Sequence, residues 1–100
     1  MQQLQRYQPD WAVLSVDGVD AEQGLTTYHA EEAMVDRIMA DRARRVLVTA
    51  DRRKIGRAGF TKICGLGAGT VIVTDSGSDP DALQALAATG AEVRTASAGA

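Results

Sequence analysis

Residues 17–54 read DGVDAEQGLTTYHAEEAMVDRIMADRARRVLVTADRRK, and this stretch decides the fold of the chain. It begins where one short apolar run, residues 11–16, ends, and it contains a second apolar run, residues 46–50, that leads directly into Asp51 and Lys54. Short apolar runs between turn residues are typical of strands in a parallel sheet that is covered on both faces. Polar residues therefore follow both predicted strands at their carboxyl ends, which is where an open α/β sheet binds its ligands.

Between these two strands, residues 29–43 predict a helix. Apolar side chains recur along it at spacings of three and four, namely Ala30, Met34, Val35, Ile38 and Met39. Either Thr26 or Thr27 can cap its start, and the acidic pair Glu31 and Glu32 favours the positive end of the helix dipole. An acidic residue at position 32 is therefore partly explained by helix stability alone, without a ligand.

The segment between the first strand and the helix, residues 17–27, is predicted to be a loop. Its two glycines, Gly18 and Gly24, allow positive φ angles and a close approach of the backbone to a ligand. Trp11, at the start of the first strand, is interpreted as a packing residue.

The rest of the chain continues the alternation of strands and helices. Residues 70–74 predict a third strand and residues 91–95 a fourth. Residues 58–63 are compatible with a short helix, although each glycine nearby weakens it by ~1 kcal/mol. Asp79 and Pro80 are typical of a helix start. Leu83, Leu86 and Ala87 are predicted to form the buried face of this last helix. Gly90 is predicted to end it.

This pattern predicts an α/β fold with the order β-α-β-α-β-α-β and a parallel sheet joined by right-handed crossovers. We expect a connector over residues 1–9, a domain over residues 10–95 and a mobile tail over residues 96–100. The glycine-rich residues 65–69 precede a strand instead of opening a helix. They therefore predict a turn and not a dinucleotide-binding loop.

The composition limits the class of protein. The chain has 100 residues, of which 45% are hydrophobic, and a net charge of −2, which favours a single globular domain over a free-standing nucleic-acid binder. It has neither a signal-peptide run nor an apolar run long enough to span a membrane, so a cytoplasmic protein is expected. The lone cysteine, Cys64, has no partner residues at metal-ligand spacing, and no metal or cofactor is predicted.

The acidic candidates follow the predicted strands or open the helix, and they are Asp17, Asp20, Glu32 and Asp51. Two carboxylates brought together would shift each other's pKa values, as acid–base catalysis requires, but Asp17 and Asp20 are equally typical of ordinary turns. Lys54 follows a buried strand closely enough to bind a phosphate, or it is a solvated loop lysine. Asp75, after the third strand, could reach the same edge or simply begin a turn.

Several segments together resemble one family. In order, they are Asp17-Gly18-Val19-Asp20, Gly24-Leu25-Thr26-Thr27, Glu31-Glu32-Ala33, Ala50-Asp51 with Lys54 and Gly56, and Val71-Ile72-Val73-Thr74-Asp75. Their spacing resembles that of the C-terminal effector domain of DeoR-type bacterial transcriptional regulators. The resemblance covers about residues 9–94, and five segments in register make it fairly specific.

The resemblance implies a fold shared with ribose-5-phosphate isomerase and CoA transferases. It also implies a non-enzymatic sensor that binds a phosphorylated sugar and alters DNA binding through a separate N-terminal helix-turn-helix. The residues implied for the effector site are Asp17, Gly18, Asp20, Gly24, Thr26, Glu32, Asp51 and Lys54. In this implied site Lys54 meets the anionic group of the ligand, and Asp17 and Glu32 accept hydroxyl groups or position the loop.

The chain departs from the family pattern in three ways. Arg53 stands where the family usually has a serine or threonine, which adds a positive charge and removes a hydroxyl group. The helix-turn-helix is not in this sequence, and neither is the first half of the effector domain with its Gly-Gly-Thr phosphate loop. The chain thus resembles the second half of the domain only.

Two other readings remain open. One is a sugar-phosphate isomerase of the same fold, although residues 21–24 offer no lysine where the isomerase pattern has a lysine- and glycine-rich loop. The other is an oligomerisation module without a ligand. In every case self-association is expected, with residues 11–16 as the open edge of the sheet, and a symmetric dimer is the commonest result.

Overall fold

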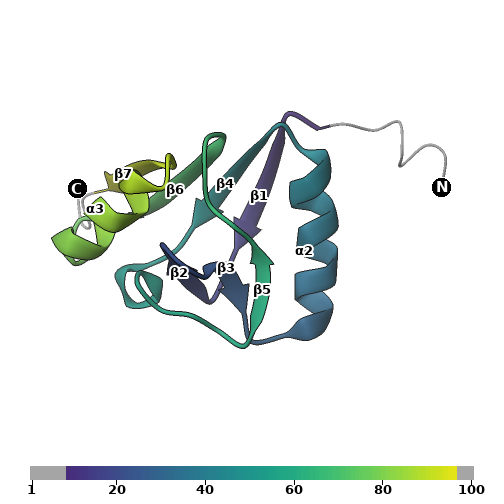
Figure 1. The fold of residues 1–100 in the computed structure, drawn as a ribbon, viewed down its shortest axis with the longest axis horizontal. Helices are drawn as coiled ribbons and strands as arrows, with labels where there is room; N and C mark the ends of the chain where they lie inside the picture. Colours follow the sequence, from purple (N-terminus) through teal and green to yellow (C-terminus); the bar gives the residue numbers. More distant parts are fainter. Residues whose placement is uncertain (1–8, 97–100) are drawn as a thin grey trace, which may run out of the picture.

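The computed structural model describes residues 9–96, which form two small β-sheets and two α-helices (Figure 1). The strands of the larger, parallel sheet are β1 (Trp11–Ser15), β4 (Arg45–Thr49), β6 (Thr70–Asp75) and β7 (Glu92–Ala96). Those of the smaller, antiparallel sheet are β2 (Gly18–Asp20), β3 (Gly24–Thr27) and β5 (Thr61–Cys64). The helical elements are α2 (Ala30–Arg42), the 3-10 turn η1 (Arg52–Lys54) and α3 (Pro80–Ala88).

The larger sheet has the spatial order β1-β4-β6-β7, with all neighbours parallel. The predicted parallel sheet is therefore confirmed, and β1 is an edge strand of it, as expected. The predicted connector and tail lie outside the described residues, apart from Pro9 and Ala96.

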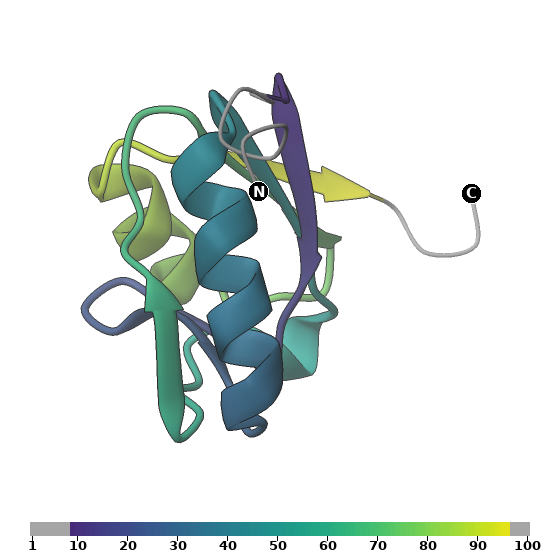
Figure 2. The ribbon, with the colours of Figure 1, turned by 90° about the vertical axis from the view of Figure 1, so that its right-hand side faces the viewer.

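The prediction that the first strand is covered on both faces is wrong. Buried and exposed side chains alternate along β1, and Trp11 and Val13 are 42% and 59% exposed. Chain connections that run in the same direction across a parallel sheet all cross on the same face when the crossovers are right-handed. Figure 2 shows this arrangement, because α2, α3 and β5 lie on one side of the sheet and no element of residues 9–96 covers the other.

The register identifies the two faces of this sheet. Val13 pairs with Leu47, and Leu47 pairs with Val71, so these apolar side chains share the uncovered face. Val13, on the edge strand, is exposed there, whereas Val71, on a central strand, is buried. Their neighbours in sequence, Leu14, Val48 and Ile72, share the covered face and belong to the hydrophobic core. Trp11 also lies on the uncovered face. The guanidinium group of Arg45 stacks over its ring, 4.8 Å from the ring centre.

Helix α2 packs on β5 and β3 through small side chains. Its buried residue is Ala33, and Ala40 packs on the core beside it. The apolar side chains that predicted the helix lie instead on its exposed side, and they are Ala30, Met34, Val35, Ile38 and Met39. A small-residue face lets the helix approach the sheet closely, so burial here follows the alanines and not the larger apolar residues.

The predicted threonine cap of α2 is also wrong. His29 occupies the N-cap position and makes no capping hydrogen bond with its side chain. The hydroxyl group of Thr27 accepts a hydrogen bond from the backbone N–H of His29 at 3.3 Å, one residue before the helix begins.

Two segments between the parallel strands differ from their predictions. Residues 17–27 contain the hairpin β2–β3 and are not a loop, and β5 lies where a short helix was predicted over residues 58–63. The hairpin and β5 form a second layer, which covers one face of the larger sheet together with α2 (Figure 1).

The C-terminal segment agrees with most of its prediction. Asp79 caps α3 by accepting a hydrogen bond from the backbone N–H of Ala82 at 3.3 Å, and Pro80 begins the helix. Leu86 is buried, whereas Ala87 is exposed, contrary to prediction. Gly90, with φ near +100°, follows the end of the helix. No helix within residues 9–96 is long and apolar enough to cross a membrane.

Candidate functional site

Two neighbouring hollows open at the carboxyl end of the larger sheet. The first, of about 650 Å³, lies between the end of β1 and the start of α2. The second, of about 450 Å³, lies over the ends of β1, β4 and β6. Ser15 and Lys54 border both hollows. The predicted site residues that border one or both are Asp17, Glu32, Asp51 and Lys54.

Lys54 is placed at the junction of the two hollows by the turn η1. This turn follows β4 directly, and its last N–H, that of Lys54, donates to the backbone carbonyl of Asp51 at 3.0 Å. Within the part of the chain that the structure describes, the Lys54 ammonium group makes no hydrogen bond or ion pair. Its charge is close enough to Asp17 and Asp51 to help lower the pKa of both carboxyls, and a half-buried cation at this junction is well placed to bind an anionic ligand.

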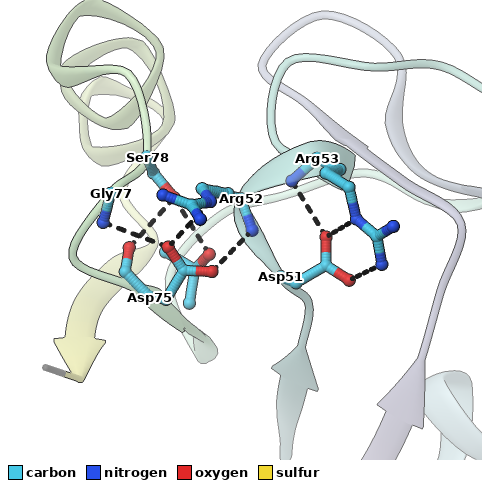
Figure 3. Close-up of polar contacts among 7 residues, drawn as sticks. Asp51, Arg52, Arg53, Asp75, Gly77 and Ser78 are labelled. Atoms are coloured by element: carbon cyan, nitrogen blue, oxygen red, sulfur yellow. Dashed lines mark hydrogen bonds and ion pairs between the residues drawn. The ribbon is translucent and has the colours of Figure 1, made fainter. Parts of the chain in front are cut away.

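The two arginines beside Lys54 are held by carboxylates (Figure 3). Asp51 accepts from the backbone N–H of Arg53 at 2.9 Å and pairs with its guanidinium group at 3.0 Å. These contacts, the side-chain hydrogen bond first, lower the pKa of the Asp51 carboxyl below its usual range. Lys54 is therefore the cation of this loop that remains available, and Asp51 offsets the extra charge of Arg53.

Asp75, at the end of β6, fixes the other side of the same turn. Its carboxylate accepts hydrogen bonds from the backbone N–H groups of Arg52 and Gly77, both at 3.0 Å, and lies 4.0 Å from the Arg52 guanidinium group (Figure 3). Asp75 thus ties η1 to the neighbouring strand. Its effect on the site is to position the turn that carries Lys54.

Asp17 and Glu32 meet at the hydroxyl group of Thr27. This hydroxyl lies 2.9 Å from the carboxylate of Asp17 and 3.4 Å from that of Glu32. The Asp17 carboxylate also accepts from the backbone N–H of Tyr28 at 3.0 Å, and this bond, followed by that from Thr27, lowers its pKa. Asp17 therefore joins the end of β1 to the segment that enters α2.

The lowered pKa of Asp17 predicts a pH-dependent contribution to stability. This contribution is present above the unfolded pKa of ~3.9 and is lost as the pH falls through the lower folded value. We expect Asp17→Asn to lower the free energy of unfolding by ~1 kcal/mol at neutral pH. The difference between the two proteins should shrink below pH ~4, which urea unfolding at several pH values would measure. A difference that does not vary with pH would contradict this role of Asp17.

The other four predicted site residues border neither hollow. Asp20 accepts hydrogen bonds from the backbone N–H groups of Glu22 and Gln23, so its carboxylate shapes the hairpin turn. The buried hydroxyl of Thr26 accepts from the backbone N–H of Gly59 at 2.6 Å. Gly18 and Gly24 lie where a Cβ atom would be 2.3 Å from a backbone oxygen, and only Gly24 has a positive φ, of +78°. These four residues therefore stabilise the β2–β3 hairpin and do not border the candidate site.

Several residues that sequence reasoning did not assign also border the hollows. Ser15 and Thr49 lie side by side in the register of β1 and β4, with their hydroxyl groups 3.5 Å apart. Asp36 borders the first hollow, where desolvation and then the nearby Glu32 raise the pKa of its carboxyl. The sequence could have predicted this hydroxyl pair, because Ser15 and Thr49 each stand near the carboxyl end of a predicted strand.

The described residues offer no metal site. No group of three or more His, Cys, Asp or Glu side chains within residues 9–96 is arranged to hold a metal ion. The thiol of Cys64 is half-buried, and burial raises its pKa, so it is a poor nucleophile.

Comparison with known proteins finds one family. The family model of the DeoR C terminal sensor domain matches residues 1–76. A protein of Escherichia coli O157:H7 named for repression of the aga operon is 36% identical over 92 residues, which are 92% of this chain and 34% of that protein. The HTH-type transcriptional regulator GlpR of Haloferax volcanii is 30% identical over 90% of this chain and 35% of its own length. The HTH-type transcriptional repressor GlcR of Bacillus subtilis is 33% identical over 75% of this chain and 29% of its own length.

Proposed function

This chain belongs to the DeoR C-terminal sensor domain family, and from that premise we propose that it senses a phosphorylated sugar at the carboxyl end of its parallel sheet. The observation that carries the proposal is the position of Lys54. Its ammonium group stands between two hollows, while Arg52 and Arg53 beside it are engaged by carboxylates.

The charges around Lys54 favour a ligand with one anionic end and several hydroxyl groups. The first hollow is bordered by the carboxylates of Asp17, Glu31 and Glu32, which repel a phosphate but accept hydrogen bonds from sugar hydroxyls. Asp36, whose carboxyl pKa is raised by desolvation and then by Glu32, borders the same hollow and can also accept a hydrogen bond. The second hollow offers the hydroxyl groups of Ser15 and Thr49. The two carboxylates at its border, Asp51 and Asp75, are each paired with an arginine, which offsets their negative charge. We therefore place the phosphate at Lys54 on the side of the second hollow, and the sugar hydroxyls in the first.

The chain spans about a third of the length of the curated relatives it matches. The relatives are transcriptional regulators by name, and several are named for a helix-turn-helix. We propose that this segment forms half of a fold of the ribose-5-phosphate isomerase type. In a regulator of this class, which acts in the cytoplasm, effector binding to the sensor domain would change the DNA affinity of the helix-turn-helix.

A thermal-shift series tests the proposal. Glucose 6-phosphate, fructose 6-phosphate and ribose 5-phosphate are each added to the protein, with glucose and inorganic phosphate as controls. A ligand that binds only the folded state raises the melting temperature, by an amount that grows with the logarithm of 1 + [L]/Kd. At least one sugar phosphate should stabilise the protein more than either control does. A module that only oligomerises would respond equally to all five compounds.

We expect no isomerase activity from this chain. Residues 21–24 contain no lysine where the isomerase pattern has a lysine- and glycine-rich loop, and the Asp20 carboxylate that precedes them is engaged in the hairpin turn, away from both hollows. Incubation with ribose 5-phosphate should give no ketose above the level in buffer. Turnover that disappears in an Asp17→Asn variant would show instead that the site is catalytic.

A further inference from the structure

The hydroxyl group of Thr27 stands where the ends of β1 and β3 meet the start of α2. Thr27 is the last residue of β3 and is only 1% exposed. Its hydroxyl lies 2.9 Å from a carboxylate oxygen of Asp17 and 3.4 Å from one of Glu32, and it accepts from the backbone N–H of His29. The family resemblance implies Thr26 for the site, whereas the structure brings Thr27 to the two carboxylates.

The hydrogen bonds around this hydroxyl leave acceptor oxygens available on both carboxylates. A hydroxyl group has one hydrogen to donate, and the shorter distance assigns it to Asp17. Within residues 9–96, Glu32 therefore has no committed donor and no ion pair. Asp17 accepts from Thr27 and from the backbone N–H of Tyr28 through the same oxygen, Oδ2, so its Oδ1 makes no hydrogen bond to a described residue. Both carboxylates are thus held near one point and still have oxygens to offer.

These two carboxylates line the same hollow as the proposed phosphate-binding lysine. Lys54 borders the first hollow together with Asp17 and Glu32, and its charge contributes to the lowered pKa of Asp17. Glu31 and Asp36 also border this hollow, but in the part of the chain that the structure describes no hydrogen bond fixes their carboxylates. A ligand with its anionic group at Lys54 therefore meets one pair of acceptors whose positions are set by the fold.

We propose that Thr27 is a positioning residue that makes the site select hydroxylated phosphates over phosphate alone. This inference rests on the proposed function. The Thr27 hydroxyl fixes Asp17 and keeps Glu32 within reach, so that each carboxylate accepts a hydrogen bond from one hydroxyl group of the ligand. Acceptors that are already in place lose little conformational freedom on binding, so these contacts add affinity that a ligand without hydroxyl groups does not gain.

Binding of two kinds of ligand to Thr27 variants tests the proposal. Glucose 6-phosphate, fructose 6-phosphate, ribose 5-phosphate and inorganic phosphate are each titrated and followed by NMR. Thr27→Val, which lacks the hydroxyl, should bind the tightest of the three sugar phosphates ~5- to 10-fold more weakly, and inorganic phosphate within ~2-fold of the unmutated chain. Thr27→Ser keeps the hydroxyl and should bind both like the unmutated chain. Circular dichroism checks that each variant is folded.

Thr89→Val is the matched control for the loss of a hydroxyl group. The Thr89 hydroxyl donates to the backbone carbonyl of Leu86 at 2.6 Å and borders neither hollow. This variant should change neither affinity.

Glu32→Ala removes one of the two acceptors from an exposed position, so the test does not depend on replacing a buried residue. It should weaken sugar-phosphate binding without weakening phosphate binding. Lys54→Ala should weaken both, which separates the role of the lysine from that of Thr27.

The Asp17 carboxyl reports on the same hydroxyl without any ligand. After the backbone N–H of Tyr28, the hydrogen bond from Thr27 is the next contribution that lowers the pKa of Asp17. This pKa should move towards its usual value in Thr27→Val and stay low in Thr27→Ser, which carboxyl-carbon NMR shifts during a pH titration would measure. An unchanged pKa in Thr27→Val would show that the hydroxyl does not hold Asp17.

The binding series separates failure of this inference from failure of the proposed function. Equal weakening of sugar-phosphate and phosphate binding in Thr27→Val would indicate a general structural effect and overturn the role of Thr27. Unchanged binding of both ligands, or a Thr27→Ser protein as weak as Thr27→Val, would overturn it as well. If no sugar phosphate binds the unmutated chain more tightly than inorganic phosphate does, the proposed function itself is wrong.

Discussion

Replacing Lys54 by alanine is expected to weaken sugar-phosphate binding ten- to more than a hundred-fold, because a charge-assisted hydrogen bond contributes ~1.5–3 kcal/mol. The fold should persist, since within residues 9–96 the Lys54 ammonium group makes no hydrogen bond or ion pair and contributes only the attraction of its charge to Asp17 and Asp51. Because one cation supplies most of the attraction, we expect the unmutated chain to bind with a dissociation constant on the order of 1 mM. Titration calorimetry on both proteins gives the ratio of affinities.

Lys62→Ala is the matched control for this substitution. Lys62 is an exposed lysine on β5 that borders neither hollow, so its replacement removes the same charge from a place remote from the site. The Lys62→Ala protein should bind the sugar phosphate with the same affinity as the unmutated chain. Equal affinity of the Lys54→Ala protein, or its failure to fold, would remove Lys54 from the proposed site.

Replacing Gly24 by alanine is expected to destabilise the chain by ~3 kcal/mol or more, a large part of the 5–15 kcal/mol typical of a domain. Two effects combine at this position. The φ angle of +78° costs an L-residue ~1–2 kcal/mol, and a Cβ atom there would lie 2.3 Å from the carbonyl oxygen of Cys64. The hairpin would have to move away from β5, which urea unfolding followed by circular dichroism would detect.

Two other glycines separate these effects. Gly56 has a similar φ of +80°, but the nearest atom to its Cβ position is a side-chain carbon of Ala82 at 3.7 Å, so Gly56→Ala should cost only the ~1–2 kcal/mol of the φ angle. Gly67 has no atom within 4 Å of its Cβ position, and Gly67→Ala should change the stability by less than ~0.5 kcal/mol. If Gly24→Ala costs no more than Gly56→Ala, the close contact with Cys64 is wrong.

The sequence predicted β1, β4 and β6 because each is a short apolar run followed by polar residues, as residues 46–50 are. The last parallel strand, β7, contains no such run. It did not predict the hairpin β2–β3, because these strands contain glycine, aspartate and threonine and have no alternating apolar pattern. It also placed the apolar face of α2 on the wrong side. Periodicity locates a face that is rich in large apolar residues, whereas Ala33 shows that close packing selected the small ones.

The position of the candidate site at the strand ends was predictable, but its internal contacts were not. Asp51 and Lys54 follow a strand in the sequence, so they had to lie at that edge. The contact between Asp75 and Arg52 depends on β6 lying next to β4, which the sequence does not specify. The sequence is compatible with a turn role for Asp20, and the hydrogen bonds that its carboxylate accepts support that interpretation.

A titration of the isotope-labelled chain with a sugar phosphate, followed by amide NMR shifts, shows whether the effector binds beside Lys54. The ligand is the compound that gives the largest thermal shift. We expect shifts concentrated at the carboxyl end of the sheet, at Ser15, Asp17, Thr49 and residues 51–54. We also expect these shifts to require far more ligand in the Lys54→Ala protein. Shifts that are absent, that lie elsewhere on the chain, or that are the same in both proteins would contradict an effector site at Lys54.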